Sequence, residues 1–143
     1  MYARGCLIGL TRGTSREHII RAAQESIAYQ VNDLLDAMAR DTGVPLSTLS
    51  VDGGASRDSF LMQFQADISG CTIRRPVIRE TTALGACYLA GLATGVWKNR
   101  EELKQLWRCD TLYHPAMEEQ ARRTLLAGWD KAVGRSLGWC KPE

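Results

Sequence analysis

A short strand-like run in the middle of the chain stops abruptly at two adjacent glycines. Leu49-Ser50-Val51-Asp52 is typical of a β-strand, Gly53-Gly54 interrupts it, and residues 56–68 have a helical pattern. Glycine lacks a β-carbon, so the turn can adopt a positive φ and a ligand can come close to its backbone. A strand that turns directly into a helix is typical of layered α/β folds, and it makes this turn the first place to look for a ligand site.

Helical and strand-like patterns alternate along the rest of the chain. Apolar residues at steps of three and four predict a long first helix over residues 19–38, with Ser15 as its N-cap and Gly43 after its end. Ser56 is the expected N-cap of the second helix, which Gly70 closes. Further strands are expected at residues 6–10, 72–75 and 111–113, and further helices at residues 82–94, 99–107 and 125–137, the last with Leu125, Leu126, Trp129, Val133 and Leu137 turned inward. The alternation predicts an α/β fold with a sheet covered by helices.

Composition limits the classes of protein and partner. The 143 residues suit one compact domain, and 45% hydrophobic with 24% charged residues excludes a disordered chain. A net charge of +2 gives no reason to expect nucleic acid or an anionic membrane as a partner. The longest uncharged stretch, from Thr81 to Trp97, contains many small residues and is too short for a membrane span.

The five cysteines are dispersed and odd in number, with only two histidines to join them. This distribution predicts no zinc site. The chain opens without a signal-peptide pattern, so we expect reduced thiols in a cytoplasmic protein.

Two interpretations of the glycine pair remain open from the residues alone. The first is a nucleotide or phosphate site, favoured by the free N–H groups at the start of the following helix. The second is a tight turn without a ligand, because glycine pairs commonly mark turns. Neither a P-loop nor a G-x-G-x-x-G pattern is present. Asp52 and Asp58 flank the turn and could hold a metal or a sugar hydroxyl. The alternative for Asp52 is a structural carboxylate that accepts from backbone donors of the loop. The alternative for Asp58 is a residue in the first turn of the helix, where a negative charge is favoured.

Arg74, Arg75 and Arg79 form a local basic cluster. It could contact a phosphate, but a solvated strand edge is the favoured interpretation, because edge strands often carry charge. No nucleophile, base and orienting group are brought together by spacing, so the residues alone predict no catalytic centre.

Several separated blocks resemble the glycerol kinases of the FGGY carbohydrate kinase family. They are Thr11-Arg12-Gly13, residues 18–22 and 25–30, Val51-Asp52-Gly53-Gly54-Ala55, residues 60–67, Thr82-Ala83-Leu84-Gly85-Ala86 and residues 88–92. The blocks agree in order and spacing from about Tyr2 to about Trp139, and the Phe60-Leu61-Met62-Gln63 block favours a glycerol kinase over a kinase of another sugar specificity.

The resemblance implies that residues 1–143 are the C-terminal part of the second, nucleotide-binding domain of an actin-like, ribonuclease H-like ATPase. It implies that Gly53, Gly54, Ala55 and Asp58 line the adenosine side of ATP or ADP. Two positions depart from the family pattern: Asp58 stands where Asn is usual, and Gln24 stands where an apolar residue is usual. Replacing Asp58 by Asn is therefore expected to tighten nucleotide binding.

The resemblance also implies a division of labour in the intact enzyme, which phosphorylates glycerol with ATP and Mg²⁺. The glycerol site, the catalytic base and the first phosphate motif belong to upstream sequence, including an N-terminal domain that is absent here. We therefore expect no catalytic residue, no metal ligand and no kinase activity in this chain alone. The alternative is a non-enzymatic module that self-associates as a homo-oligomer or binds a partner.

Overall fold

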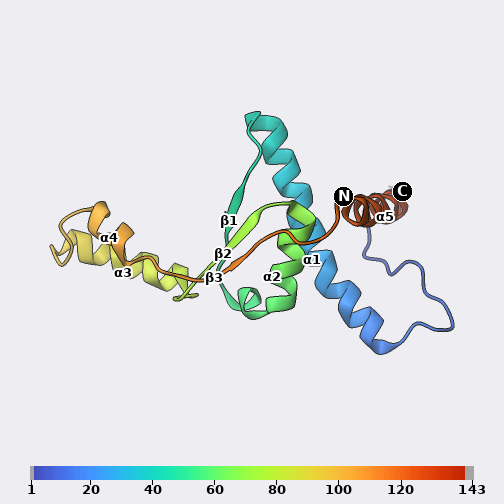
Figure 1. Ribbon diagram of the computed structural model, residues 1–143, viewed down its shortest axis with the longest axis horizontal. Helices are drawn as coiled ribbons and strands as arrows, with labels where there is room; N and C mark the ends of the chain where they lie inside the picture. Colours follow the sequence, from blue (N-terminus) through green and yellow to red (C-terminus); the bar gives the residue numbers. More distant parts are fainter. Residues whose placement is uncertain (1, 141–143) are drawn as a thin grey trace.

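The structure, a computed structural model, describes residues 2–140, and Figure 1 shows their arrangement. In chain order the elements are α1 (Arg16–Thr42), β1 (Thr48–Ser50), the 3-10 helix η1 (Gly54–Arg57), α2 (Ser59–Ser69), β2 (Thr72–Pro76), α3 (Thr81–Ala93), α4 (Arg100–Leu106), β3 (Cys109–Tyr113) and α5 (Glu119–Ser136). The predicted mixed α/β architecture is confirmed.

The ends of α1 follow from local chemistry. Ser15 is the N-cap, and its backbone N–H donates to Nδ1 of His18 at 3.0 Å, so an otherwise unpaired amide is satisfied. At the other end Gly43 has φ 70°, and its N–H donates to the carbonyl of Ala39. Both predicted ends of this helix are therefore confirmed.

The sheet has three strands in the order β1-β2-β3. β1 runs parallel to β2, with Leu49 opposite Ile73, and β2 runs antiparallel to β3, with Ile73 opposite Tyr113. The N–H of Val51 still donates to the carbonyl of Arg74, at 3.1 Å, just past the end of β1. The turn and α2 therefore form the crossover between two parallel strands.

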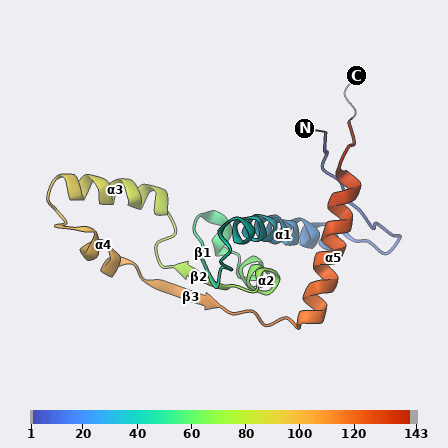
Figure 2. The same cartoon turned by 90° about the horizontal axis from the view of Figure 1, so that it is seen from above.

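The hydrophobic core lies where α2 packs between α1 and the sheet. Its buried members are Ala28, Tyr29, Leu61, Met62, Phe64, Ala66, Ile68, Ile73 and Tyr113. The ring of Trp129 on α5 stacks on that of Tyr29, with centroids 5.2 Å apart, and its indole N–H donates to Asp33 at 2.8 Å. In Figure 2, α5 accordingly lies across α1.

α3 and α4 form an arm that extends away from this core (Figures 1 and 2). Asn99 caps α4 through the N–H of Glu102, as its spacing predicts. Gly91 lies against the ring of Trp97, where a β-carbon would clash at 2.0 Å. The small residue at this position therefore makes room for an indole ring.

Two expectations about apolar residues near the ends of the chain are wrong. Residues 6–10 form no strand, and Leu7, Ile8 and Leu10 are 54–60% exposed. A strand needs a neighbouring strand for its backbone hydrogen bonds, and within residues 2–140 none lies beside this segment. Leu137 follows the end of α5 and is 61% exposed, so it is not turned inward.

Among the described residues, no helix combines the length and the apolar character that a membrane span requires.

Candidate nucleotide site

The glycine turn, residues 52–58, has a backbone conformation that requires glycine at one position. Gly53 has φ 73° and ψ −173°, a region that residues with a β-carbon hardly ever adopt. Its N–H donates to the carbonyl of Arg79 at 2.8 Å, and its carbonyl accepts from the hydroxyl of Ser56 at 2.7 Å. The turn is thus held from outside by the β2–α3 connection and from within by Ser56.

The outer side of the glycine turn is open. A β-carbon placed on Gly53 or Gly54 would meet no atom within 4 Å, and both Gly54 and Ala55 are exposed. A cavity of about 220 Å³ adjoins the turn, lined by Ile27, Val31, Leu49, Val51, Asp52, Ala55, Ser56, Leu61, Met62 and Gln65. Because this is smaller than a typical ligand pocket, it could take only part of a nucleotide.

Asp58, not Ser56, is the N-cap of α2. Its Oδ1 accepts from the N–H groups of Phe60 and Leu61 at 2.9 and 3.2 Å. Ser56 is a buried residue of η1, the turn of 3-10 helix that precedes α2. It is therefore too early in the chain to cap α2. The predicted cap is therefore wrong by two residues. The first amides of α2 are consequently occupied by a carboxylate, so the helix start is not open to a phosphate.

Asp52 accepts a hydrogen bond from the hydroxyl of Thr81 at the start of α3. This contact ties the end of β1 to α3, on the same side as the bond from Gly53 to Arg79. In the structure Asp52 therefore has a structural contact, made with a side chain and not with the backbone donors that the sequence suggested.

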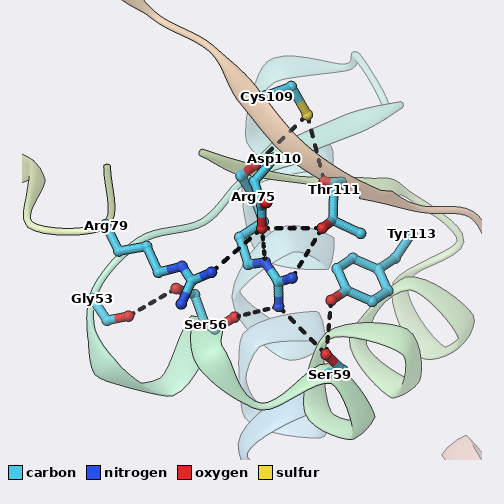
Figure 3. Close-up of polar contacts among 9 residues, drawn as sticks. All are labelled: Gly53, Ser56, Ser59, Arg75, Arg79, Cys109, Asp110, Thr111 and Tyr113. Atoms are coloured by element: carbon cyan, nitrogen blue, oxygen red, sulfur yellow. Dashed lines mark hydrogen bonds and ion pairs between the residues drawn. The ribbon is translucent and has the colours of Figure 1, made fainter. Parts of the chain in front are cut away.

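A polar network centred on Arg75 adjoins the glycine turn (Figure 3). Its Nε donates to Asp110 at 3.0 Å, Nη1 to the carbonyl of Ser56 and the hydroxyl of Ser59, and Nη2 to Thr111 at 2.9 Å. The hydroxyl of Tyr113 adds a bond to Ser59 at 3.1 Å. One buried guanidinium thus joins β2, β3, η1 and the start of α2.

The network corrects the interpretation of the basic cluster as a solvated edge. β2 is the central strand, and only 9% of Arg75 is exposed. Arg74 lies over the ring of Trp107, at 4.3 Å from its centroid, and Arg79 reaches Asp110 at 3.4 Å. Hydrogen bonds from Thr111 and then from Arg75 hold the pKa of Asp110 below its ordinary value. The arginines are therefore engaged within the protein.

Most of this network was missed from the sequence, although one signal for it was present. In β2, Ile73 and Arg75 are two residues apart and share a face. If Ile73 faces the core, Arg75 must do so too, and a buried arginine needs an acidic or polar partner. What the sequence does not show is that Asp110, 35 residues away, supplies it.

The sequence match to a known domain and the fold define the class of this protein. Residues 2–94 match the C-terminal domain of the FGGY family of carbohydrate kinases, and the chain belongs to that family. Solved carbohydrate kinases have the actin-like ATPase fold, and the α/β architecture described above is part of it.

Within this family, several similar curated proteins are glycerol kinases. The chain is 59% identical over 141 residues to glycerol kinase of Caldanaerobacter subterraneus subsp. tengcongensis, and 58% identical over 139 residues to that of Brachyspira hyodysenteriae. The matches cover 99% and 97% of this chain but 28% of each relative's length.

A solved structure extends the similarity to three dimensions. The structure of Plasmodium falciparum glycerol kinase with ADP superposes with a TM-score of 0.83 at 38% identity, over 94% of this chain and 27% of that one. Gluconate kinase from Lactobacillus acidophilus superposes with a TM-score of 0.76 at 26% identity, over 96% and 28%.

Proposed function

We propose that this chain is the C-terminal, nucleotide-binding portion of a glycerol kinase, which transfers the γ-phosphoryl group of ATP to glycerol and yields glycerol 3-phosphate. The observation that carries the proposal is the glycine turn, with one glycine in a backbone conformation reserved for glycine and open space beside both. Gly53, Gly54, Ala55 and Asp58 would line the adenosine side of the nucleotide.

The structure favours the adenosine end over the phosphate end for this turn. Asp58 occupies the first amides of α2 and carries a negative charge, so the phosphates would extend away from that helix. The phosphates and glycerol would then be bound mainly by other parts of the complete enzyme. This agrees with a chain that spans about 28% of the length of its curated relatives.

Mg²⁺ and the catalytic base are not assigned to this chain. Between residues 2 and 140 no group of three or more His, Cys, Asp or Glu residues is placed to hold a metal ion. We therefore propose that the metal site and the catalytic base lie elsewhere in the complete enzyme, and that this chain alone does not phosphorylate glycerol. A cytoplasmic location is part of the same proposal, and the five free cysteines are compatible with it.

Glycerol is proposed over another sugar because eight similar curated proteins, at 55–59% identity, are glycerol kinases. The decisive experiment replaces the matching C-terminal portion of the Caldanaerobacter relative with this chain. We expect the chimera to phosphorylate glycerol with ATP and to prefer glycerol over gluconate and xylulose. A chimera that is folded, binds glycerol and yet binds no ADP would contradict the proposal.

A second candidate function, self-association as a homo-oligomer, is favoured by the apolar surface of α1. Ile19, Ile20, Ile27, Leu34 and Met38 are 40–60% exposed on this helix, and such surface commonly marks an interface. Light scattering of the purified 143-residue chain tests it. A dimer or larger species without bound nucleotide would favour this function, and a monomer that binds ADP would contradict it.

A further inference from the structure

We infer that Gln24 is a positioning residue for the glycine turn and acts through Asp58. The inference rests on the proposed nucleotide function of that turn. Its basis is a hydrogen bond between residues 34 positions apart, from Nε2 of Gln24 on α1 to Oδ2 of Asp58, at 2.6 Å.

The two carboxylate oxygens of Asp58 have separate roles. Oδ1 accepts from the N–H groups of Phe60 and Leu61 and caps α2, while Oδ2 accepts only from Gln24 among the contacts of residues 2–140. A carboxylate held at both oxygens cannot rotate about its terminal bond. Gln24 therefore fixes the orientation in which Asp58 caps the helix.

The direction of Gln24 is set by the packing on either side of it. One turn earlier on α1, the guanidinium of Arg21 lies 3.8 Å from the ring centroid of Phe60. One turn later, the carbonyl of Ala28 accepts from Nε2 of Gln65 at 3.4 Å. Because α1 contacts α2 on both sides of Gln24, this side chain meets Asp58 from a rigid support.

Asp58 in turn holds the backbone of the glycine turn, which contains the proposed nucleotide-lining residues. It is both the N-cap of α2 and the C-cap of η1, and its N–H donates to the carbonyl of Ala55 at 3.1 Å. Both side chains are partly buried, so loss of the Gln24 donor would leave Oδ2 of Asp58 without a partner, or the carboxylate would turn outward and release the cap. An outward carboxylate would also bring an acceptor-only, negative group toward a bound nucleotide.

The test uses the 143-residue chain with Gln24→Leu, Asp58→Asn and the double substitution. Gln30→Leu is the matched control, because within residues 2–140 the side-chain amide of Gln30 bonds only inside α1, to the carbonyl of Ser26. Amide hydrogen exchange is measured by NMR without ligand at residue 58, whose N–H donates to the carbonyl of Ala55, and at Phe60 and Leu61, whose N–H groups are capped. ADP affinity is measured by titration calorimetry.

We expect Gln24→Leu to speed exchange at these amides and to weaken ADP binding, each by about three- to tenfold, and the control to change either by less than about twofold. Asn caps helices as well as Asp does and carries no charge, so Asp58→Asn should preserve exchange protection and bind ADP at least as tightly. In the double substitution the amide introduced at position 58 also lacks a partner at position 24, but it is neutral and costs less to leave unpaired than a carboxylate does. Both readouts should therefore be clearly less impaired than in Gln24→Leu alone.

A double substitution as impaired as Gln24→Leu alone would overturn the inference, because simple loss of packing at Gln24 is not relieved at Asp58. Unchanged exchange in Gln24→Leu would overturn it too. If the original chain binds no ADP while the exchange data follow the expected pattern, the positioning of the turn stands and nucleotide binding by the isolated chain fails.

Discussion

The side chains of Arg75 and Asp110 face each other across the β2–β3 pair, with Nε and Oδ2 3.0 Å apart. The register explains how this is possible. Arg75 lies opposite Thr111 and Pro76 lies opposite Cys109, so Asp110 is an extra residue in the ladder. A β-bulge of this kind lets two consecutive residues face the same side, and Asp110 and Thr111 accordingly both bond to Arg75.

Replacing Arg75 by Lys should destabilise the chain by about 2–3 kcal/mol, because an ammonium cannot reproduce the planar set of donors that this buried site uses. Arg74→Lys is the matched control. Arg74 lies over the ring of Trp107, and a Lys there retains the cation–π contact, so we expect a change below about 1 kcal/mol. Urea unfolding of both variants measures the difference. Equal losses would contradict a special role for the guanidinium of Arg75.

Asp110 makes this stability depend on pH. Bonds from Thr111 and Arg75 lower its pKa in the folded state, so its contribution is present above the ordinary aspartate pKa of about 3.9 and is lost as the pH falls below it. Asp110→Asn should therefore be clearly less stable than the original chain at pH 7, and the gap should narrow as the pH falls from about 4 to 3. Urea unfolding across this range measures it, and a gap independent of pH would be the contrary result.

Local signals in the sequence predicted most of the elements. The helix ends at Ser15, Gly43, Gly70 and Asn99 follow from capping chemistry, which depends on residues only a few positions apart. The expected strand at residues 6–10 failed because strand formation depends on a neighbour, which no local pattern reveals.

In the candidate site, too, the local features could be predicted from the sequence and the contacts between distant residues could not. The glycine turn was visible from the sequence because a strand, two glycines and a helix are contiguous. The Arg75–Asp110 and Gln24–Asp58 contacts were not, since they join residues 35 and 34 positions apart. The prediction that Arg74, Arg75 and Arg79 lie on a solvated strand edge was wrong for a topological reason. β3 pairs with β2 on the side away from β1 and makes β2 the central strand.

The buried phenol of Tyr29 should make folding stability depend on pH in the alkaline range as well. Its ring is buried against Phe64 and Trp129, and burial, followed by the charge of Glu25, raises the pKa of Tyr29 to about 12. A raised pKa means that the folded chain keeps this proton while the unfolded chain loses it, so stability falls between about pH 10 and 12. Tyr29→Phe should remove this part of the decline. Denaturant unfolding at pH 9 to 11.5 measures it, and parallel curves for the two proteins would refute the expectation.

Substitutions of the two glycines should have different effects: Gly53→Ala mainly on folding stability, and Gly54→Ala mainly on nucleotide binding. Gly53→Ala should cost about 1–3 kcal/mol of folding stability, because φ 73° with ψ −173° is almost closed to a residue with a β-carbon. Gly54 begins η1, its φ is not positive, and a β-carbon there meets no atom within 4 Å. Gly54→Ala should therefore leave the chain equally stable or stabilise it by about 0.4–1 kcal/mol.

The methyl group that Gly54→Ala introduces should nevertheless interfere with a nucleotide that approaches the backbone of the turn. We expect Gly54→Ala to weaken ADP binding by about tenfold, which corresponds to about 1.4 kcal/mol. Thermal unfolding without ligand and calorimetric titration with ADP, carried out on the same preparations, give the two quantities. If Gly54→Ala binds ADP as tightly as the original chain, the nucleotide does not pass over this turn, and the glycine pair is only a tight connection between β1 and α2.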